Sequence, residues 1–189
     1  MVRLSERKKV LEKAVVVRTM QNVNLPMEER LEIAEKYLQT FPQKEVPLEE
    51  SYGYNLYVRE IVMPAGSFAI GRVHKYEHLS IMIEGELIMW TEFDDVVHLK
   101  GYNKVIAPAG IRRAGMILQD TKWITAHGVD PLMNPEDMVP SLTVSNYAEY
   151  TKFKRTEMLS IPGSVKLTES EVAQAQLEAD ICRLRDDLP

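Results

Sequence analysis

The sequence predicts a mainly β fold that carries helical appendages at both ends. Apolar residues recur at helical spacing before residue 50, and short strand-like runs separated by Gly, Pro or Asp turns follow from Tyr54. After Asp130 the strand pattern stops and helical signals return. We therefore expect an N-terminal helical arm at residues 1–50, an antiparallel β-barrel at 51–130, and a C-terminal helical extension at 131–189.

The N-terminal arm has the signals of a helix that buries one face. Asn24 suits a helix cap and Pro26 suits the first turn. The apolar residues that follow at helical spacing are Leu31, Ala34, Leu38 and Phe41.

The barrel segment contains strand-like runs and no helix-length segment between them, which excludes a parallel α/β fold. The tripeptide Glu84-Gly85-Glu86 is predicted to be a tight turn that ends one strand. The expected strands are Leu56–Met63, Phe68–Val73, His78–Ile83, Leu87–Thr91, Val96–Leu99, Lys104–Ala107 and Lys122–Ala126.

The C-terminal extension is predicted to end in an amphipathic helix. Thr168 and Glu171 form a capping-box pair. An apolar stripe then follows, which would dock on the barrel of the same chain or on a second subunit. Because exposed stripes mark interfaces, we expect a homo-oligomer, at least a homodimer. The stripe consists of Leu177, Ile181, Leu184 and Leu188.

Composition excludes several classes of protein. The net charge of −5 and the pI near 5.5 argue against a nucleic-acid-binding protein. The single cysteine, Cys182, excludes an internal disulfide and a multi-cysteine metal site. No apolar run is long enough for a membrane span, and the charged N-terminus has no signal-peptide core. The expected location is the cytoplasm of a bacterial or phage-infected cell.

A polar stripe in the barrel segment predicts a pocket. In an extended chain, alternate side chains share one face. The residues that would lie on the same side are Arg72, His74, Tyr76, His78, Ser80 and Met82. A barrel interior normally carries aliphatic residues there. Imidazoles, a guanidinium and a phenol in their place indicate a binding site.

These residues resemble the motifs of the cupin superfamily, whose members are jelly-roll barrels of the double-stranded β-helix type. Counting back from Gly85, His78 takes the usual Glu position of the first motif, and His74 takes the second His position. Arg72 takes the first His position, and Arg113 takes the His position of the second motif, after Pro108-x-Gly110. The usual four-ligand metal set is therefore not reproduced.

A narrower pattern resembles uncharacterised single-cupin proteins common in phage genomes. That resemblance implies that His127 belongs to the same constellation as His74 and His78. The pattern consists of His74-Lys75-x-Glu77-His78-Leu79, Pro108-x-Gly110-x-x-Arg113-x-Gly115 and Asp120-Thr121-x-Trp123-x-Thr125-x-His127.

His74, His78 and His127 are the candidate metal ligands. Imidazole binds divalent transition metals such as Zn, Fe, Ni or Mn through a neutral nitrogen. The alternative is that the three rings share hydrogen bonds inside a polar barrel that holds no cofactor. His74 and His78 are also candidate catalytic residues, because histidine exchanges protons near neutral pH.

Arg72 and Arg113 are candidate ligand-binding residues, since a guanidinium binds carboxylate or phosphate with two hydrogen bonds. Tyr76 and Tyr102 are expected at the mouth of the pocket. The alternative for Arg113 is a place on the rim in an ion pair with Asp120 or another acid. For the neighbouring Arg112, such a structural role is the expectation.

Two functions follow from these residues. The first is binding of a small, anionic molecule, with or without a metal, in a protein that could be an isomerase- or lyase-type enzyme. The second is a non-catalytic scaffold or interaction protein with a protein partner, for instance a phage accessory or host-inhibiting protein.

Overall fold

The computed structural model describes residues 14–43, 45–91 and 96–160. The predicted C-terminal stripe and Cys182 lie outside the described residues. The chain forms two compact units, residues 1–150 and 151–189, and the barrel belongs to the first. The described helices are a short one at residues 14–20, α2 (Met27–Leu38), α3 (Pro135–Leu142) and α4 (Tyr147–Ser160).

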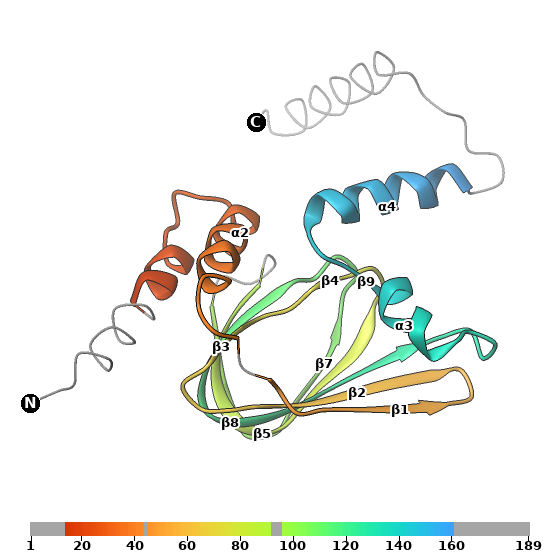
Figure 1. Ribbon diagram of the computed structural model, residues 1–189, viewed down its shortest axis with the longest axis horizontal. Helices are drawn as coiled ribbons and strands as arrows, with labels where there is room; N and C mark the ends of the chain where they lie inside the picture. The colour runs from red at the N-terminus through yellow and green to blue at the C-terminus, as the bar shows by residue number, and fades with distance from the viewer. Residues whose placement is uncertain (1–13, 44, 92–95, 161–189) are drawn as a thin grey trace, which may run out of the picture. The chain divides into compact units, whose positions relative to one another are not determined.

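The mainly β, antiparallel fold predicted from the sequence is confirmed (Figure 1). Within the described residues, seven strands form one sheet in the order β1-β2-β8-β5-β6, with β3 paired to β8 and β7 paired to β5. A second sheet pairs β4 with β9. The strands are β1 (Leu48–Gly53), β2 (Leu56–Met63), β3 (Phe68–Ile70), β4 (Val73–His74), β5 (His78–Thr91), β6 (Val97–Lys100), β7 (Asn103–Ala107), β8 (Arg113–Gly128) and β9 (Thr143–Val144).

The prediction of a turn at Glu84-Gly85-Glu86 is wrong. β5 continues through these residues, and its register with β8 shifts on both sides of Gly85, which marks a bulge. Gly85 has φ +112°, and a Cβ there would lie 2.5 Å from Thr121 Cα and 2.6 Å from the Asp120 carbonyl oxygen. The bulge therefore requires glycine and bends one long strand where the sequence analysis placed two.

Several further boundaries differ from the expected ones. The strand expected at Lys122–Ala126 begins nine residues earlier, because β8 runs from Arg113 to Gly128. The sheet begins at Leu48, inside the predicted helical arm, because β1 forms a hairpin with β2 through a turn at Asn55. The predicted strand Phe68–Val73 is split into β3 and β4. β9 comes from the predicted C-terminal extension, and it pairs His74 with Thr143.

The N-terminal arm packs on the barrel beside β3, as Figure 1 shows. Leu31 and Ala34 of α2 are buried with Trp90 of β5. Arg112 is 1% exposed and makes a 2.7 Å ion pair with Glu35 of α2. Arg112 also donates to the Gly71 carbonyl, so it holds the arm to the barrel. The expected ion pair with an acid is present, but the side chain is buried and not on a rim.

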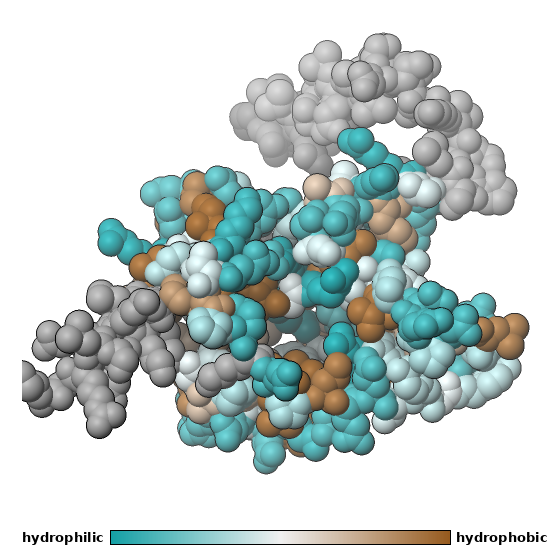
Figure 2. All heavy atoms as spheres, in the orientation of Figure 1, coloured by the Kyte–Doolittle hydropathy of each residue, from teal (hydrophilic) through white to brown (hydrophobic). Residues whose placement is uncertain are grey.

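Figure 2 shows mostly hydrophilic residues over one face, with separate hydrophobic patches between them. None of the helices in the described residues combines the length and the apolar character that a membrane crossing requires.

We predict that Gly85→Ala destabilises the fold by about 2–4 kcal/mol, because it adds backbone strain to a backbone clash. Gly101→Ala is the matched control, since Gly101 also has positive φ (65°) but no atom within 4 Å of its would-be Cβ. That variant should lose only about 1 kcal/mol. Urea denaturation measures both values, and equal losses would contradict the bulge argument.

Candidate metal and ligand site

Three strands bring three histidines together. His78 begins β5, and the register that pairs Leu79 with Ala126 places His78 beside His127 of β8. His74 lies on β4, where its N–H donates to the Ile111 carbonyl (3.0 Å) and its carbonyl accepts from Gly110 N–H (2.7 Å). These backbone contacts fix each histidine on a paired strand or against a neighbouring loop.

The rings of the three histidines stack on one another. Ring centroids lie 3.9 Å apart for His74 and His78, 4.6 Å for His78 and His127, and 5.2 Å for His74 and His127. One nitrogen from each ring belongs to a set whose members all lie within 4.8 Å of one another. His78 and His127 are each 3% exposed. The structure thus brings the predicted metal ligands into one buried cluster.

Each ring has a buried nitrogen with no hydrogen-bond partner among the described residues: His74 Nδ1, His78 Nε2 and His127 Nδ1. The other nitrogen of His78, Nδ1, lies 3.3 Å from the Tyr76 carbonyl oxygen. Because a carbonyl only accepts, Nδ1 carries the proton in this contact and Nε2 keeps a free lone pair. A second nitrogen anchored in this way is usual for histidines that bind metal.

The cluster is uncharged at neutral pH. Burial lowers the pKa of His74 to about 2, and the nearby His78, His127, Arg113 and Arg59 add to the effect. Burial also lowers the pKa of His78 and of His127 to about 4. Neutral imidazoles in a buried site are available as ligands or as proton acceptors.

A cavity of about 230 Å³ adjoins the cluster at His74. Its lining has an apolar part and a basic part, and no aspartate or glutamate among the described residues. The apolar part consists of Ile61, Met63, Ala69, Ile70, Leu87, Met89, Ala114, Ile117 and Trp123, and the charged part of Arg59, Arg72 and Arg113.

Arg113 lies in the wall of this cavity and not on the rim. Its Nη1 donates to Ser80 Oγ (2.7 Å), and its guanidinium carbon lies 5.7 Å from the centre of the Trp123 ring. The same Ser80 oxygen accepts from Trp123 Nε1 (3.1 Å). Arg113 Nε is buried without a hydrogen-bond partner in the described residues. The alternative that Arg113 pairs with Asp120 does not hold, since Asp120 accepts from Ala65 N–H instead.

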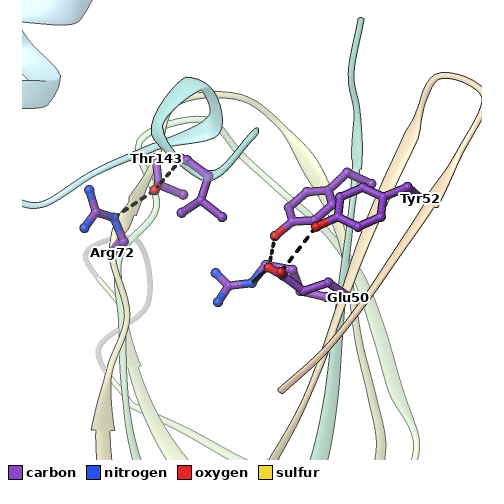
Figure 3. A network of polar contacts seen from close by, with 7 residues as sticks. Glu50, Tyr52, Arg72 and Thr143 are labelled. Atoms are coloured by element: carbon purple, nitrogen blue, oxygen red, sulfur yellow. Dashed lines mark hydrogen bonds and ion pairs between the residues drawn. The ribbon is translucent and has the colours of Figure 1, made fainter. Parts of the chain in front are cut away.

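Arg72 and Arg59 are held by other groups. Arg72 is exposed and its Nε donates to Thr143 Oγ1 (2.8 Å) (Figure 3). Arg59 Nε lies 3.5 Å from Glu50 Oε1, across the β1–β2 hairpin. Glu50 also accepts from Tyr52 and Tyr57, as the dashed lines of Figure 3 show for Tyr52. Burial and this hydrogen bond raise the pKa of Tyr57.

The structure places the predicted tyrosines away from the cavity lining. Tyr76 is 43% exposed and Tyr102 is 65% exposed. The sequence places Ser80 on the inward face without assigning it a role, and it does not indicate Arg59 as a site residue. Arg59 lies in a strand whose other residues are largely apolar, and the face it occupies depends on its pairing with Thr125 of β8.

No protein-family model and no curated protein matches the sequence. Among solved structures, the chain is similar to a cupin family protein with a double-stranded β-helix fold from Methanocaldococcus jannaschii. Identity is 16% and the TM-score 0.39, over 47% of this chain and 84% of that one. A cupin superfamily protein from Desulfitobacterium hafniense gives 14% identity and a TM-score of 0.39, over 58% and 94%.

A third similar structure is a DMSP lyase from Ruegeria pomeroyi, at 16% identity and a TM-score of 0.40. The match covers 47% of this chain and 49% of the lyase, about half of its length.

We predict that the metal-free protein loses stability as the pH falls from 6.5 towards 4. The native pKa values of about 2, 4 and 4 lie below the ordinary 6.5, so in this window the unfolded chain takes up protons that the native cluster refuses. Each histidine contributes at most about 1.4 kcal/mol per pH unit. Urea denaturation between pH 7 and pH 4.5 measures the slope.

His127→Asn should reduce that slope by the contribution of one histidine, at most about 1.4 kcal/mol per pH unit. His98→Asn is the control, because His98 is exposed and paired with Glu86 outside the cluster. A slope unchanged in His127→Asn, or equally reduced in His98→Asn, would contradict the assignment.

Proposed function

We propose that this protein is a cupin-like barrel that holds one divalent transition metal ion through His74, His78 and His127 and binds a small anionic molecule in the adjoining cavity. The observation that carries the proposal is the convergence of three buried imidazoles, each with a nitrogen free of hydrogen bonds. Such groups are costly to bury without a partner, and a metal ion would satisfy all three.

The residues present fit a metal of this class. Three neutral imidazole nitrogens suit Zn, Fe, Ni or Mn and leave further coordination positions open. Two nitrogens that share a zinc ion at 2.0–2.1 Å lie at most about 4.2 Å apart. A set whose members lie within 4.8 Å of one another is close to this spacing, and the stacked rings would have to turn so that each lone pair points at one ion. When bound, such an ion acts as a Lewis acid on a ligand oxygen.

The cavity supports the small-molecule part of the proposal. Its volume, about 230 Å³, lies below the 300–1,000 Å³ of pockets for drug-sized ligands. The guanidinium groups in its wall favour a negative charge. His74 is the one histidine of the cluster among the residues that line the cavity, so in an isomerase- or lyase-type reaction it is the ring that would lie nearest the bound molecule.

A second candidate function is a non-catalytic scaffold that acts through protein contacts. It would form a homo-oligomer or bind a protein partner, as a phage accessory protein would. Two exposed apolar side chains favour it. Tyr54 is 86% exposed at the β1–β2 turn, and Leu132 is 89% exposed after β8. A hydrogen bond from Val129 N–H to the Asn55 carbonyl joins these two loops. A scaffold would not need the histidine cluster to bind metal.

We predict that the protein, stripped with a chelator and dialysed against Zn²⁺ or Co²⁺, takes up one ion per chain. His78→Ala and His127→Ala should each weaken binding at least about 100-fold, since loss of an outer-shell partner alone costs 10- to 100-fold. His98→Ala, a histidine outside the cluster, should bind as the wild type does. Metal analysis and the Co²⁺ absorption spectrum measure these outcomes.

Failure of the wild type to bind either Zn²⁺ or Co²⁺ would refute the metal function and favour the scaffold. Equal affinity in His78→Ala and His98→Ala would place the metal elsewhere.

A further inference from the structure

From the charge and shape of the cavity we infer its ligand class: a small monocarboxylate with an apolar tail, its carboxylate on Arg113 and its tail against the apolar wall. This inference deepens the proposed function and rests on its small-molecule part, not on the metal.

The three arginines that line the cavity differ in how their positive charge is compensated. Arg59 is balanced by Glu50, and Arg72 is exposed to solvent. Arg113 is partly buried in the cavity wall, and the described residues place no carboxylate within ion-pair distance of it. Burial lowers the pKa of Arg113 to about 10, which leaves the group charged at neutral pH. A buried, unpaired charge is costly, so the cavity favours one matching negative charge.

Two contacts fix the orientation of the Arg113 guanidinium. Nη1 is used by Ser80, and the ring of Trp123 flanks the guanidinium. Nε remains unpartnered in the described residues. These contacts hold the planar group in place with donors left over, which suits the two oxygens of a carboxylate.

The rest of the ligand would lie against the apolar wall of the cavity. Met63, Leu87, Met89, Ile117 and Trp123 line the cavity and belong to one buried hydrophobic cluster. A second charged group on the ligand would have to lie against this apolar surface without a partner, which is unfavourable. A tail of a few carbon atoms would bury apolar area there, and methionine side chains adapt to its shape.

Isothermal titration calorimetry with acetate, butyrate and hexanoate tests the inference, on both the metal-free and the metal-loaded protein. Affinity should rise about fourfold per methylene from acetate to hexanoate, as apolar burial requires. Succinate and inorganic phosphate should bind more weakly than butyrate. Butylamine and 1-butanol, which keep the tail and lose the carboxylate, should bind at least about tenfold more weakly.

Arg113→Gln should weaken butyrate binding about 10- to 100-fold, and Arg113→Lys should recover part of the loss. Lys104→Gln removes the same charge at an exposed position of β7 outside the cavity, and it should bind butyrate as the wild type does. Unchanged circular dichroism of Arg113→Gln shows that the loss is not one of folding.

The outcomes separate the two proposals. Butyrate binding that survives in His127→Ala and is lost in Arg113→Gln supports the ligand class whether or not metal binds. Metal binding without any monocarboxylate binding overturns the ligand class alone. Phosphate or succinate binding more tightly than butyrate also overturns it.

Discussion

The pairing of β5 with β8 is the interaction on which the rest of the structure depends. The two strands run antiparallel along most of their length, and the bulge at Gly85 lets one continuous β5 pair with β7 before the bend and β6 after it. The same ladder sets His78 beside His127 and pairs Ser80 with Thr125. The bend at Gly85 thus lets the sheet curve into a barrel. The register of β5 with β8 before the bend sets the positions of the site residues.

A second, much shorter ladder completes the histidine cluster. β4 and β9 pair over two residues, and this pairing positions His74 against the ends of the long strands. The site therefore combines His78 and His127 from the long β5–β8 ladder with His74, which is held by pairing with the distant strand β9. Three neutral rings can share this space because burial keeps protons off them, whereas three imidazolium ions at such distances would repel one another.

The sequence predicts the inward face of the central strand well and its ends poorly. Alternation identifies His78, Ser80 and Met82 as one buried face, since a strand has period two. The expected strands leave His74 outside both Phe68–Val73 and His78–Ile83, because its place in β4 depends on pairing with β9. Glu84-Gly85-Glu86 has the composition of a turn, and only the partner strand decides that a bulge forms. The role of Arg59 depends in the same way on Glu50 across the hairpin.

The charges at the site connect its two proposed occupants. A metal ion at the histidines lies near the positive Arg113, which already lowers the pKa of His74 and would oppose a cation in the same way. A carboxylate on Arg113 cancels that repulsion, because opposite charges attract strongly where water is excluded. If both ligands bind, each therefore raises the affinity for the other by the same factor, as thermodynamic linkage requires. Arg113 would then couple the two proposed ligands, as a neutral fourth histidine in its position would not: the anion strengthens metal binding without being required for it.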